Sequence, residues 1–226
     1  MRKARQDERA ALAALMFDQF YEKEELQQQF AGVDEQTARR FGPAVLSLGQ
    51  GYYFTRGDVF VCEGADGTPI GAIVGADPRR LSRLGPLGQL AYALRNRKLL
   101  RDIPRPLLAQ LMRNSRPVMD VHSTNWYKRY CKHPYYIAQF GVDKAHRGSG
   151  AARELLDGVI AHAAAQGYPA VVLETLSREN VPMYLHFGFF LKQVYTCGAF
   201  TEYRLIKYLP NEYKMTAHRR SFFMLH

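Results

Sequence analysis

The hydrophobic positions of the chain follow two periods, one of about two residues and one of about 3.6. Residues 58–63 and 68–75 are rich in β-branched residues, and Ala65-Asp66-Gly67 lies between them. This pattern predicts a β-hairpin. Residues 190–195 and 199–208 also alternate, around Cys197-Gly198, and predict a second antiparallel pair.

Helical spacing dominates most of the first 53 residues. Residues 1–5 predict a short first strand, and Asp7 is placed to cap a helix. The apolar positions of that helix are Ala11, Leu12, Leu15, Met16 and Phe20. We expect residues 22–32 to be irregular because they are polar. A second helix is predicted at about 37–53, with its first turn near Pro43 and with Phe41, Val45 and Leu48 facing inward.

Residues 79–132 interrupt this alternation of strands and helices. Two segments punctuated by proline, around 87–100 and 106–113, carry leucines at helical spacing and arginines on their other faces. We interpret them as an inserted helical hairpin. Residues 123–133 form a basic aromatic stretch that leads into the next strand.

The stretch from Tyr135 to Ala152 joins a strand, a glycine-rich loop and a helix. Residues 135–142 are apolar, aromatic and β-branched, Gly148 and Gly150 follow, and a helical pattern begins at Ala151 and stops at Gly167. Unpaired amides and the positive end of the helix dipole would meet at this loop. The pattern therefore predicts an anion site, most plausibly for a pyrophosphate.

The length and composition indicate one cytoplasmic domain. The chain has 226 residues, of which 47% are hydrophobic. Its three cysteines are far apart, so the sequence suggests neither a disulfide framework nor a zinc site, and we expect no metal. The first residues lack the apolar core of a signal peptide, and no run is apolar enough for a membrane span.

The positive charge is concentrated in one segment. The chain has a formal net charge of +10, and residues 79–132 hold 13 lysines and arginines against two acidic residues. Such a segment is most often the solvated face of amphipathic helices. It could also bind nucleic acid, an acidic acceptor or an anionic membrane surface. Trp126, Tyr127 and Tyr130 could stack on bases or form the wall of an acceptor pocket.

The glycine loop matches neither of the two best-known phosphate loops. A P-loop needs Gly-Lys-Ser/Thr where this chain has Gly150-Ala151-Ala152, and a dinucleotide fingerprint needs a third glycine where it has Arg153. The loop resembles motif A of the GNAT acetyltransferases. The Arg/Gln-x-x-Gly-x-Gly/Ala pattern of that family is met by Arg147, Gly150 and Ala152.

A second stretch supports the resemblance in the expected order along the chain. It is similar to the next strand and helix of the family through Leu173, Glu174, Thr175, Asn180, Pro182, Tyr184, Gly188 and Phe189. The resemblance covers residues 135–208 and is nearest to the small-molecule branch that includes puromycin N-acetyltransferase. It implies an α/β GNAT fold, in which helices flank a mixed, mostly antiparallel sheet and a helical insertion precedes the motif A strand. Within this single domain, 79–132 is the insertion, 135–190 the acetyl-CoA-binding core and 210–226 a basic tail.

The resemblance also implies which residues bind acetyl-CoA. The backbone of the loop would meet the pyrophosphate, His146 and Arg147 would add positive charge, and the motif A strand would bind the pantetheine arm. These residues are Phe140, Gly141, Val142, His146, Arg147, Gly148, Ser149, Gly150, Ala151, Ala152 and Asn180. Asn180 could equally be an N-cap of the helix that follows.

Two side chains are candidates for catalysis. The resemblance implies that Tyr184 protonates the departing CoA thiolate, although an aromatic residue at this spacing could simply pack in the core. Glu174 is the candidate base for the amine proton, and its alternative is a carboxylate bonded to backbone at a strand end. The motif A strand itself carries no carboxylate that could be the base.

The sequence therefore predicts direct acetyl transfer from acetyl-CoA to the amine of a small molecule. One alternative keeps this chemistry but acetylates tRNA or a protein, with residues 79–132 as the docking face. The other alternative is a non-catalytic module that binds CoA or nucleic acid. The residues do not identify the acceptor.

Overall fold

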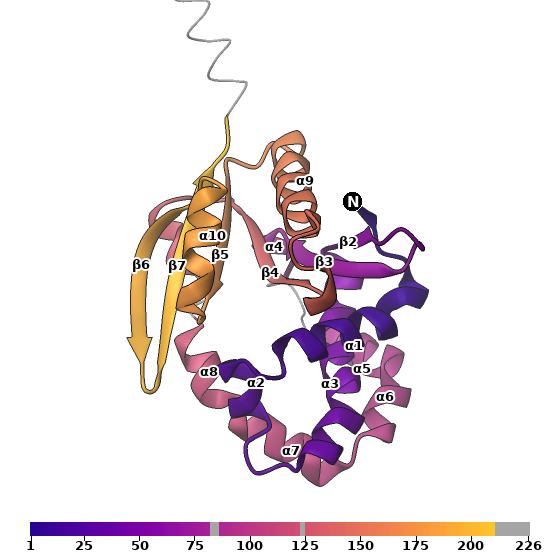
Figure 1. Cartoon of the computed structure of the whole chain (residues 1–226). Coiled ribbons are helices and arrows are strands. Elements are labelled where there is room, and N and C mark those ends of the chain that lie inside the picture. Colours follow the sequence, from indigo (N-terminus) through magenta and orange to yellow (C-terminus); the bar gives the residue numbers. More distant parts are fainter. Residues whose placement is uncertain (82–85, 123–124, 211–226) are drawn as a thin grey trace, which may run out of the picture.

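A computed structural model describes residues 1–81, 86–122 and 125–210, so nearly all of the predicted basic tail at 210–226 lies outside the described residues. A seven-stranded sheet in the order β1-β2-β3-β4-β5-β7-β6 runs through the molecule (Figure 1). Its strands are β1 (Arg2–Lys3), β2 (Asp58–Glu63), β3 (Pro69–Ala76), β4 (Tyr135–Val142), β5 (Ala170–Thr175), β6 (Phe190–Cys197) and β7 (Phe200–Tyr208). The structure confirms the short first strand and both predicted antiparallel pairs.

Strands β4 and β5 are the parallel neighbours in this sheet, and they pair over only part of their length. The register runs from Tyr135 opposite Val171 to Ile137 opposite Leu173 and stops there. On the other side of β4, the register with β3 shifts so that Ala138 is an extra residue. A bulge of this kind bends a strand. The sheet therefore opens after Ile137, and residues 138–142 have no strand partner on their β5 side.

One face of the sheet is covered by α9 (Ala151–Ala165) and α10 (Val181–His186). The first of these begins and ends close to the sequence prediction. Leu155, Leu156 and Val159 of α9 pack with Ile73, Ile137, Leu173 and Leu205 of the sheet in one buried cluster. Burial of an aliphatic side chain of this size stabilises the fold by roughly 1.5–3 kcal/mol.

The opposite face is covered by α1 (Arg9–Phe20) and α3 (Glu35–Arg56), with α2 (Glu24–Gln29) at its edge. Leu12, Met16 and Phe17 of α1 contact Val59, Val61, Ala72 and Val74 in a second buried cluster. Trp126 and Tyr127 belong to a third cluster, over Ala170, Val172 and Ile206 at the β5–β7 end of the sheet.

Three local predictions for the first 56 residues were wrong. Residues 22–32 contain the short helix α2. None of its residues is buried, so its sequence is polar and lacks the apolar period that predicts a helix. Helix α3 begins at Glu35, and Asp34 caps it by accepting a hydrogen bond from the Thr37 amide. Pro43 therefore lies inside the helix. Asp7 belongs to a 3-10 turn and does not cap α1.

The insertion at 79–132 is helical, but it is more than the predicted hairpin. It contains α4 (Pro78–Leu81), α5 (Pro86–Arg95), α6 (Arg97–Asp102), α7 (Arg105–Asn114) and α8 (Arg116–Val121). Figure 1 shows α5–α7 beside α1–α3 and α8 at the β6–β7 end. Ile103, Leu107 and Leu111 join the α1–α3 cluster. The basic residues of α5–α8, from Arg95 to Arg116, are exposed, as expected for a solvated face.

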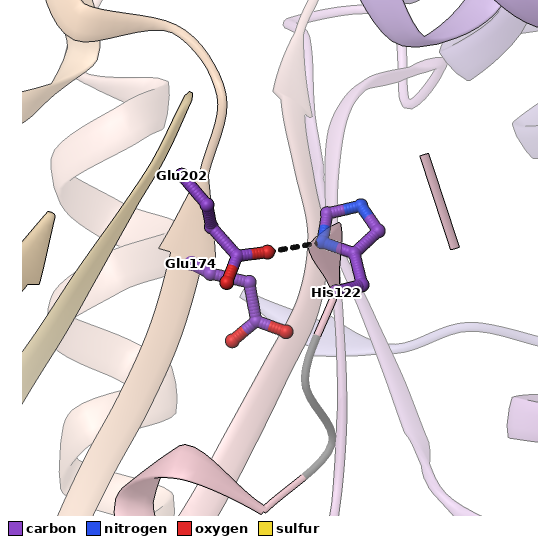
Figure 2. A group of neighbouring side chains, drawn as sticks. All are labelled: His122, Glu174 and Glu202. Carbon is purple, nitrogen blue, oxygen red and sulfur yellow. Dashed lines mark hydrogen bonds and ion pairs between the residues drawn. The ribbon is translucent and has the colours of Figure 1, made fainter. Parts of the chain in front are cut away.

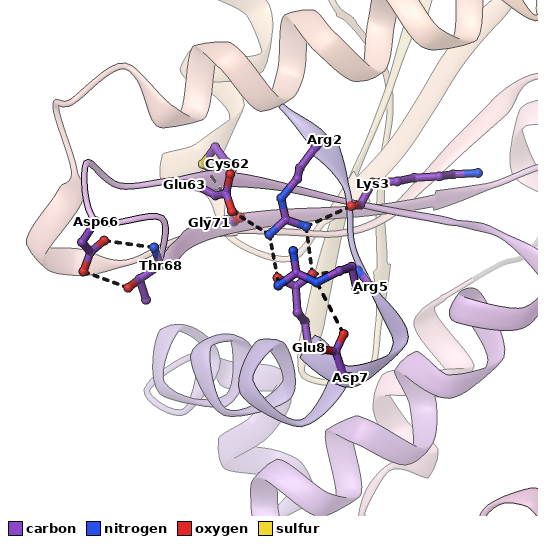
Figure 3. A network of polar contacts seen from close by, with 10 residues as sticks. All are labelled: Arg2, Lys3, Arg5, Asp7, Glu8, Cys62, Glu63, Asp66, Thr68 and Gly71. Atoms are coloured by element: carbon purple, nitrogen blue, oxygen red, sulfur yellow. Dashed lines mark hydrogen bonds and ion pairs between the residues drawn. The ribbon is translucent and has the colours of Figure 1, made fainter.

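The N-terminus is fixed to the sheet edge by a network of charges (Figure 3). The Arg2 guanidinium donates to Glu8 at 2.6 Å and to Glu63 at 2.6 Å, and Arg5 also contacts Glu8 at 2.9 Å. Hydrogen bonding from Arg2 lowers the pKa of the Glu8 carboxyl to about 2.

Among the described helices, none has both the length and the apolar character that crossing a membrane requires.

Candidate active site

The glycine loop lies between the end of β4 and the start of α9. Gly148 and Gly150 have φ values of +85° and +92°, a region that glycine enters without steric cost. Gly150 is the N-cap of α9, and no side chain caps the helix there. Residues 147–150 are exposed, so the start of the helix faces solvent.

The amides of this loop divide into two alternating sets. Arg147 and Ser149 donate to carbonyls within the loop, at 3.4 and 3.3 Å, and the Ala151 amide is 3.4 Å from the Ser149 hydroxyl. The amides of Gly148, Gly150 and Ala152 have no hydrogen-bond partner within the described parts of the chain. Three free donors beside a positive helix end are the features that the predicted anion site requires.

One of the two basic side chains near this loop contacts a carboxylate of the protein. His146 Nδ1 lies 3.2 Å from the Asp143 carboxylate, whereas no ion pair of Arg147 is found within the described residues.

Gly141 on β4 is explained by packing against α1. A Cβ there would lie 2.9 Å from the sulfur of Met16, so a larger residue would push α1 away.

A cavity of about 340 Å³ lies where β4 and β5 part. It is lined by Phe20, Glu25, Leu26, Gln29, Val45, Leu46, Gly49, Ala138, Gln139, Phe140, Glu174, Thr175, Asn180 and Tyr184. Tyr184 belongs to the cluster under α9 and α10, whereas Val45 and Leu46 belong to the cluster on the opposite face. The cavity therefore extends from one face of the sheet to the other through the opening between the strands.

Tyr184 is buried against Phe189, with ring centroids 5.8 Å apart. Burial raises the pKa of its phenol above the usual value, so the hydroxyl stays protonated at neutral pH. Within the residues that the structure describes, this hydroxyl has no hydrogen-bond partner. It combines core packing with a place on the cavity wall, so the two sequence interpretations are compatible.

Glu174 is held by two side chains, not by the backbone contacts of the alternative interpretation. The Tyr136 hydroxyl donates to one carboxylate oxygen at 2.7 Å, and the Trp126 indole donates to the other at 3.1 Å. Burial raises the pKa of Glu174, although both hydrogen bonds act in the opposite direction. A carboxylate with a raised pKa is a better base near neutral pH.

A buried charge network lies beside Glu174 (Figure 2). His122 Nδ1 contacts one oxygen of Glu202, and the Arg204 guanidinium donates to the other at 2.6 Å. Ligand atoms of His122, Glu174 and Glu202 lie within 4.8 Å of one another. The sequence does not single out His122, Glu202 and Arg204, because nothing in a local pattern links His122 to Glu202, which is 80 positions away.

This network satisfies its own charges. Arg204 and His122 both contact Glu202. Burial acts to lower the pKa of His122, but the hydrogen bond with Glu202 and the charges of Glu202, Glu174 and Glu25 outweigh burial, so the pKa is raised. Arg204 pairs with Glu202 and His122 contacts the same carboxylate, so Glu202 needs no further cation. Protein donors likewise occupy both oxygens of Glu174.

Two further sequence expectations change with the structure. Trp126 and Tyr127 are buried, at 7% and 6% exposure, so these aromatics are not available to stack on bases. Trp126 instead orients Glu174. Asn180 is the N-cap of α10 but makes no side-chain capping hydrogen bond, and it lines the cavity.

Comparison with known proteins agrees with this arrangement. Residues 110–189 match the model of the Acetyltransferase (GNAT) family, and this match contains both β4 and β5, the glycine loop and Tyr184. The chain has the GNAT fold, and this segment carries the sequence pattern of the GNAT acetyltransferase superfamily. Members of this superfamily generally use acetyl-CoA as the acetyl donor.

Solved GNAT structures share the whole fold of the chain. A "histone acetyltransferase HPA2 and related acetyltransferase" from Corynebacterium glutamicum is 14% identical, with 92% of this chain and 96% of that chain covered at a TM-score of 0.62. An N-acetyltransferase from Staphylococcus aureus Mu50 is 18% identical, with 91% and 98% covered at 0.57. A mutant agmatine N-acetyltransferase in its apo form is 15% identical, with 92% and 98% covered at 0.54.

These identities establish the GNAT fold and not a substrate. No curated protein matches the sequence significantly. The acceptor of this GNAT protein therefore has to be argued from its own cavity.

Proposed function

We propose that this GNAT protein transfers the acetyl group of acetyl-CoA to an amine of a small molecule, inside the cavity between β4 and β5. The observation that carries the proposal is the cavity of about 340 Å³, which Glu174 and Tyr184 both line. A base and an acid on one enclosed surface are what direct amine acetylation requires.

The donor would bind along the parted edge of β4. Its pyrophosphate would accept hydrogen bonds from the free amides of Gly148, Gly150 and Ala152, with the dipole of α9 adding to the attraction. The pantetheine arm would pair with residues 138–142, which have no strand partner on their β5 side. Both contacts use the backbone, so they need few particular side chains.

The chemical step then needs three proton transfers. Glu174 would take a proton from the acceptor ammonium group, and the neutral nitrogen would attack the thioester carbonyl carbon. The carbon–sulfur bond would break as the tetrahedral intermediate collapses, and Tyr184 would give its proton to the CoA sulfur. The nitrogen would lose its second proton to solvent. The products are the N-acetylated amine and the free thiol, while Glu174 releases its proton to solvent and Tyr184 regains one from it. Placing the nitrogen about 3 Å from the carbonyl carbon supplies much of the rate.

The position of the basic helices supports a small acceptor over tRNA or a protein. The cavity lining includes no residue of the insertion at 79–132. Trp126 and Tyr127 are buried, so the basic aromatic stretch presents no stacking platform from these rings. A solved structure that is named as an agmatine N-acetyltransferase has the same fold, which supports a small amine as the acceptor.

The test is a mass-spectrometric screen of amine metabolites and amine antibiotics with acetyl-CoA, read together with release of free thiol. We expect an acetylated product with at least one small amine and stoichiometric thiol release. Acetylation only of tRNA or of protein lysines would contradict the small-molecule assignment. Binding of CoA without any turnover would make the protein a non-catalytic module.

A further inference from the structure

The cavity wall has a charge opposite to that of the whole protein. The chain has a formal net charge of +10, yet the cavity lining includes two carboxylates, Glu25 and Glu174, and neither lysine nor arginine. A cavity with this lining attracts cations and repels anions. The acceptor amine is protonated in water, so it would enter as a cation.

Glu25 has a free acceptor inside the protein. Its Oε2 atom is buried and has no hydrogen-bond partner in the described parts of the chain. Burial raises the pKa of the Glu25 carboxyl. The neighbouring acidic residues are different, because Glu22 pairs with Lys144 and Glu179 pairs with Lys23, both at 2.8 Å. A buried acceptor without a donor destabilises the protein, and a bound ammonium group would relieve this cost.

The carboxylates at the inner end of the cavity have different partners. Glu202 is contacted by His122 (Figure 2) and by Arg204. Glu174 receives only neutral donors, from Tyr136 and Trp126, and His122 lies near it without forming an ion pair. The cavity therefore presents two separate carboxylates that form no ion pair within the described residues, one at Glu174 and one at Glu25.

A second cavity continues from Glu25. It has a volume of about 400 Å³, and Glu25 lines both cavities. Its charged lining residues are Glu22, Lys23, Glu24, Glu25, Arg178 and Glu179. Carboxylates outnumber cations there, so a chain-like cation that passes Glu25 meets a further acidic surface.

We infer that the acceptor is a linear diamine or polyamine, whose reacting amine lies at Glu174 while Glu25 binds its second ammonium group. This inference rests on the proposed acetyl transfer and adds the substrate class. A monoamine would leave Glu25 unpaired, and an acceptor with a carboxylate at this position would face two like charges. The second cavity has space for a part of the acceptor that extends beyond the ammonium group bound at Glu25.

The experiment measures steady-state acetylation of a series of α,ω-diamines and of alkyl monoamines with the same number of carbons. We expect kcat/KM to be about 10- to 100-fold higher for the best diamine than for its matched monoamine, the range for one charge-assisted hydrogen bond. Glu25→Gln should abolish most of this preference through KM, because the diamine loses the partner of its second ammonium group and the monoamine has no such group to lose.

Glu24→Gln is the matched control, because it removes the same charge from the same helix and Glu24 is exposed and lines only the outer cavity. It should leave short diamines unaffected. Circular dichroism and calorimetric CoA binding check that the Glu25→Gln protein is folded. Equal kcat/KM for diamines and monoamines, or an equal loss in both variants, would overturn the inference and leave the acetyltransferase assignment standing. Failure of the wild-type protein to acetylate any amine would overturn both.

Discussion

The two sides of the opening between β4 and β5 are built in different ways. The proposed donor side includes one continuous segment, the loop at 147–152 with the start of α9, and this segment presents backbone amides to solvent. The proposed acceptor side is assembled from α1, α2, α3, β4, β5 and α10, and it presents side chains that include two carboxylates and neither lysine nor arginine. A backbone site binds a donor that many proteins share, whereas a side-chain site selects one acceptor.

The largest expected effect is on the acceptor side. Glu174→Gln keeps the size of the side chain and an oxygen that can accept a hydrogen bond, but it removes the base. We expect kcat to fall about 10²- to 10⁴-fold, while calorimetric CoA affinity stays the same. Unchanged kcat would show that water takes the amine proton and that Glu174 only lines the cavity.

The same residue predicts a pH dependence. The pKa of Glu174 is raised by burial, and the base must be deprotonated, so kcat/KM should increase as pH rises through that pKa. In a pH–rate profile, the Glu174→Gln protein should lack this increase of kcat/KM with pH. If the increase persisted unchanged in the variant, it would be due to the titration of another group.

The next largest effect is expected at Tyr184, which lies on the cavity wall. Tyr184→Phe removes one hydroxyl and keeps the ring contact with Phe189. We expect kcat to fall about 10- to 10³-fold without a change in CoA affinity, provided that chemistry limits the rate. Equal single-turnover rates in the two proteins would reduce Tyr184 to a packing residue.

On the donor side we expect a change in affinity and not in chemistry. Ala152→Glu places a negative charge in the first turn of α9, where it favours the helix but repels a pyrophosphate. We expect the Kd for CoA to rise about 5- to 50-fold while the melting temperature is maintained. Ala161→Glu, an exposed position further along the same helix, is the control, and an equal loss of affinity there would indicate a general charge effect.

A change remote from both sides should affect stability alone. Glu8→Gln weakens the network with Arg2 and Arg5, and we expect the melting temperature at pH 7 to fall by about 2–6 °C. The folded pKa of Glu8 is about 2, below its ordinary value of 4.5. The stabilisation is therefore complete above pH 4.5 and is lost as pH falls toward 2, so the two melting curves should converge in acid.

The smallest effect is expected from the basic helices. Replacing the exposed Arg95, Arg97, Lys98 and Arg101 with glutamine should leave turnover of a small amine within about twofold, because none of them lines the cavity. A salt titration of RNA binding is the companion measurement. Submicromolar RNA affinity near physiological salt that disappears in this variant would restore the macromolecular acceptor.

The contrast between the two sides also explains what the sequence could predict. The glycine loop and α9 are local, so the positive φ values at Gly148 and Gly150 follow from residues next to one another. The β-hairpin at 58–76 was predictable for the same reason. The role of Trp126 was not, because its contact with Glu174 joins residues 48 positions apart.

Helix α2 shows the same limit at the level of secondary structure. It has no fully buried residue, so its sequence lacks the apolar period that identifies a helix. Glu25 and Leu26 nevertheless line the cavity. Glu25 and Leu26 are half-exposed, and a local apolar pattern does not identify residues of this kind.

The most direct test of this division is an initial-velocity measurement over a grid of acetyl-CoA and amine concentrations, for the wild-type, Ala152→Glu and Glu174→Gln proteins. We predict that Ala152→Glu raises KM for acetyl-CoA and leaves KM for the amine unchanged, whereas Glu174→Gln lowers kcat and leaves KM for acetyl-CoA unchanged. If Ala152→Glu altered only the amine parameters, or if Glu174→Gln acted only through acetyl-CoA, the assignment of the two sides would be contradicted.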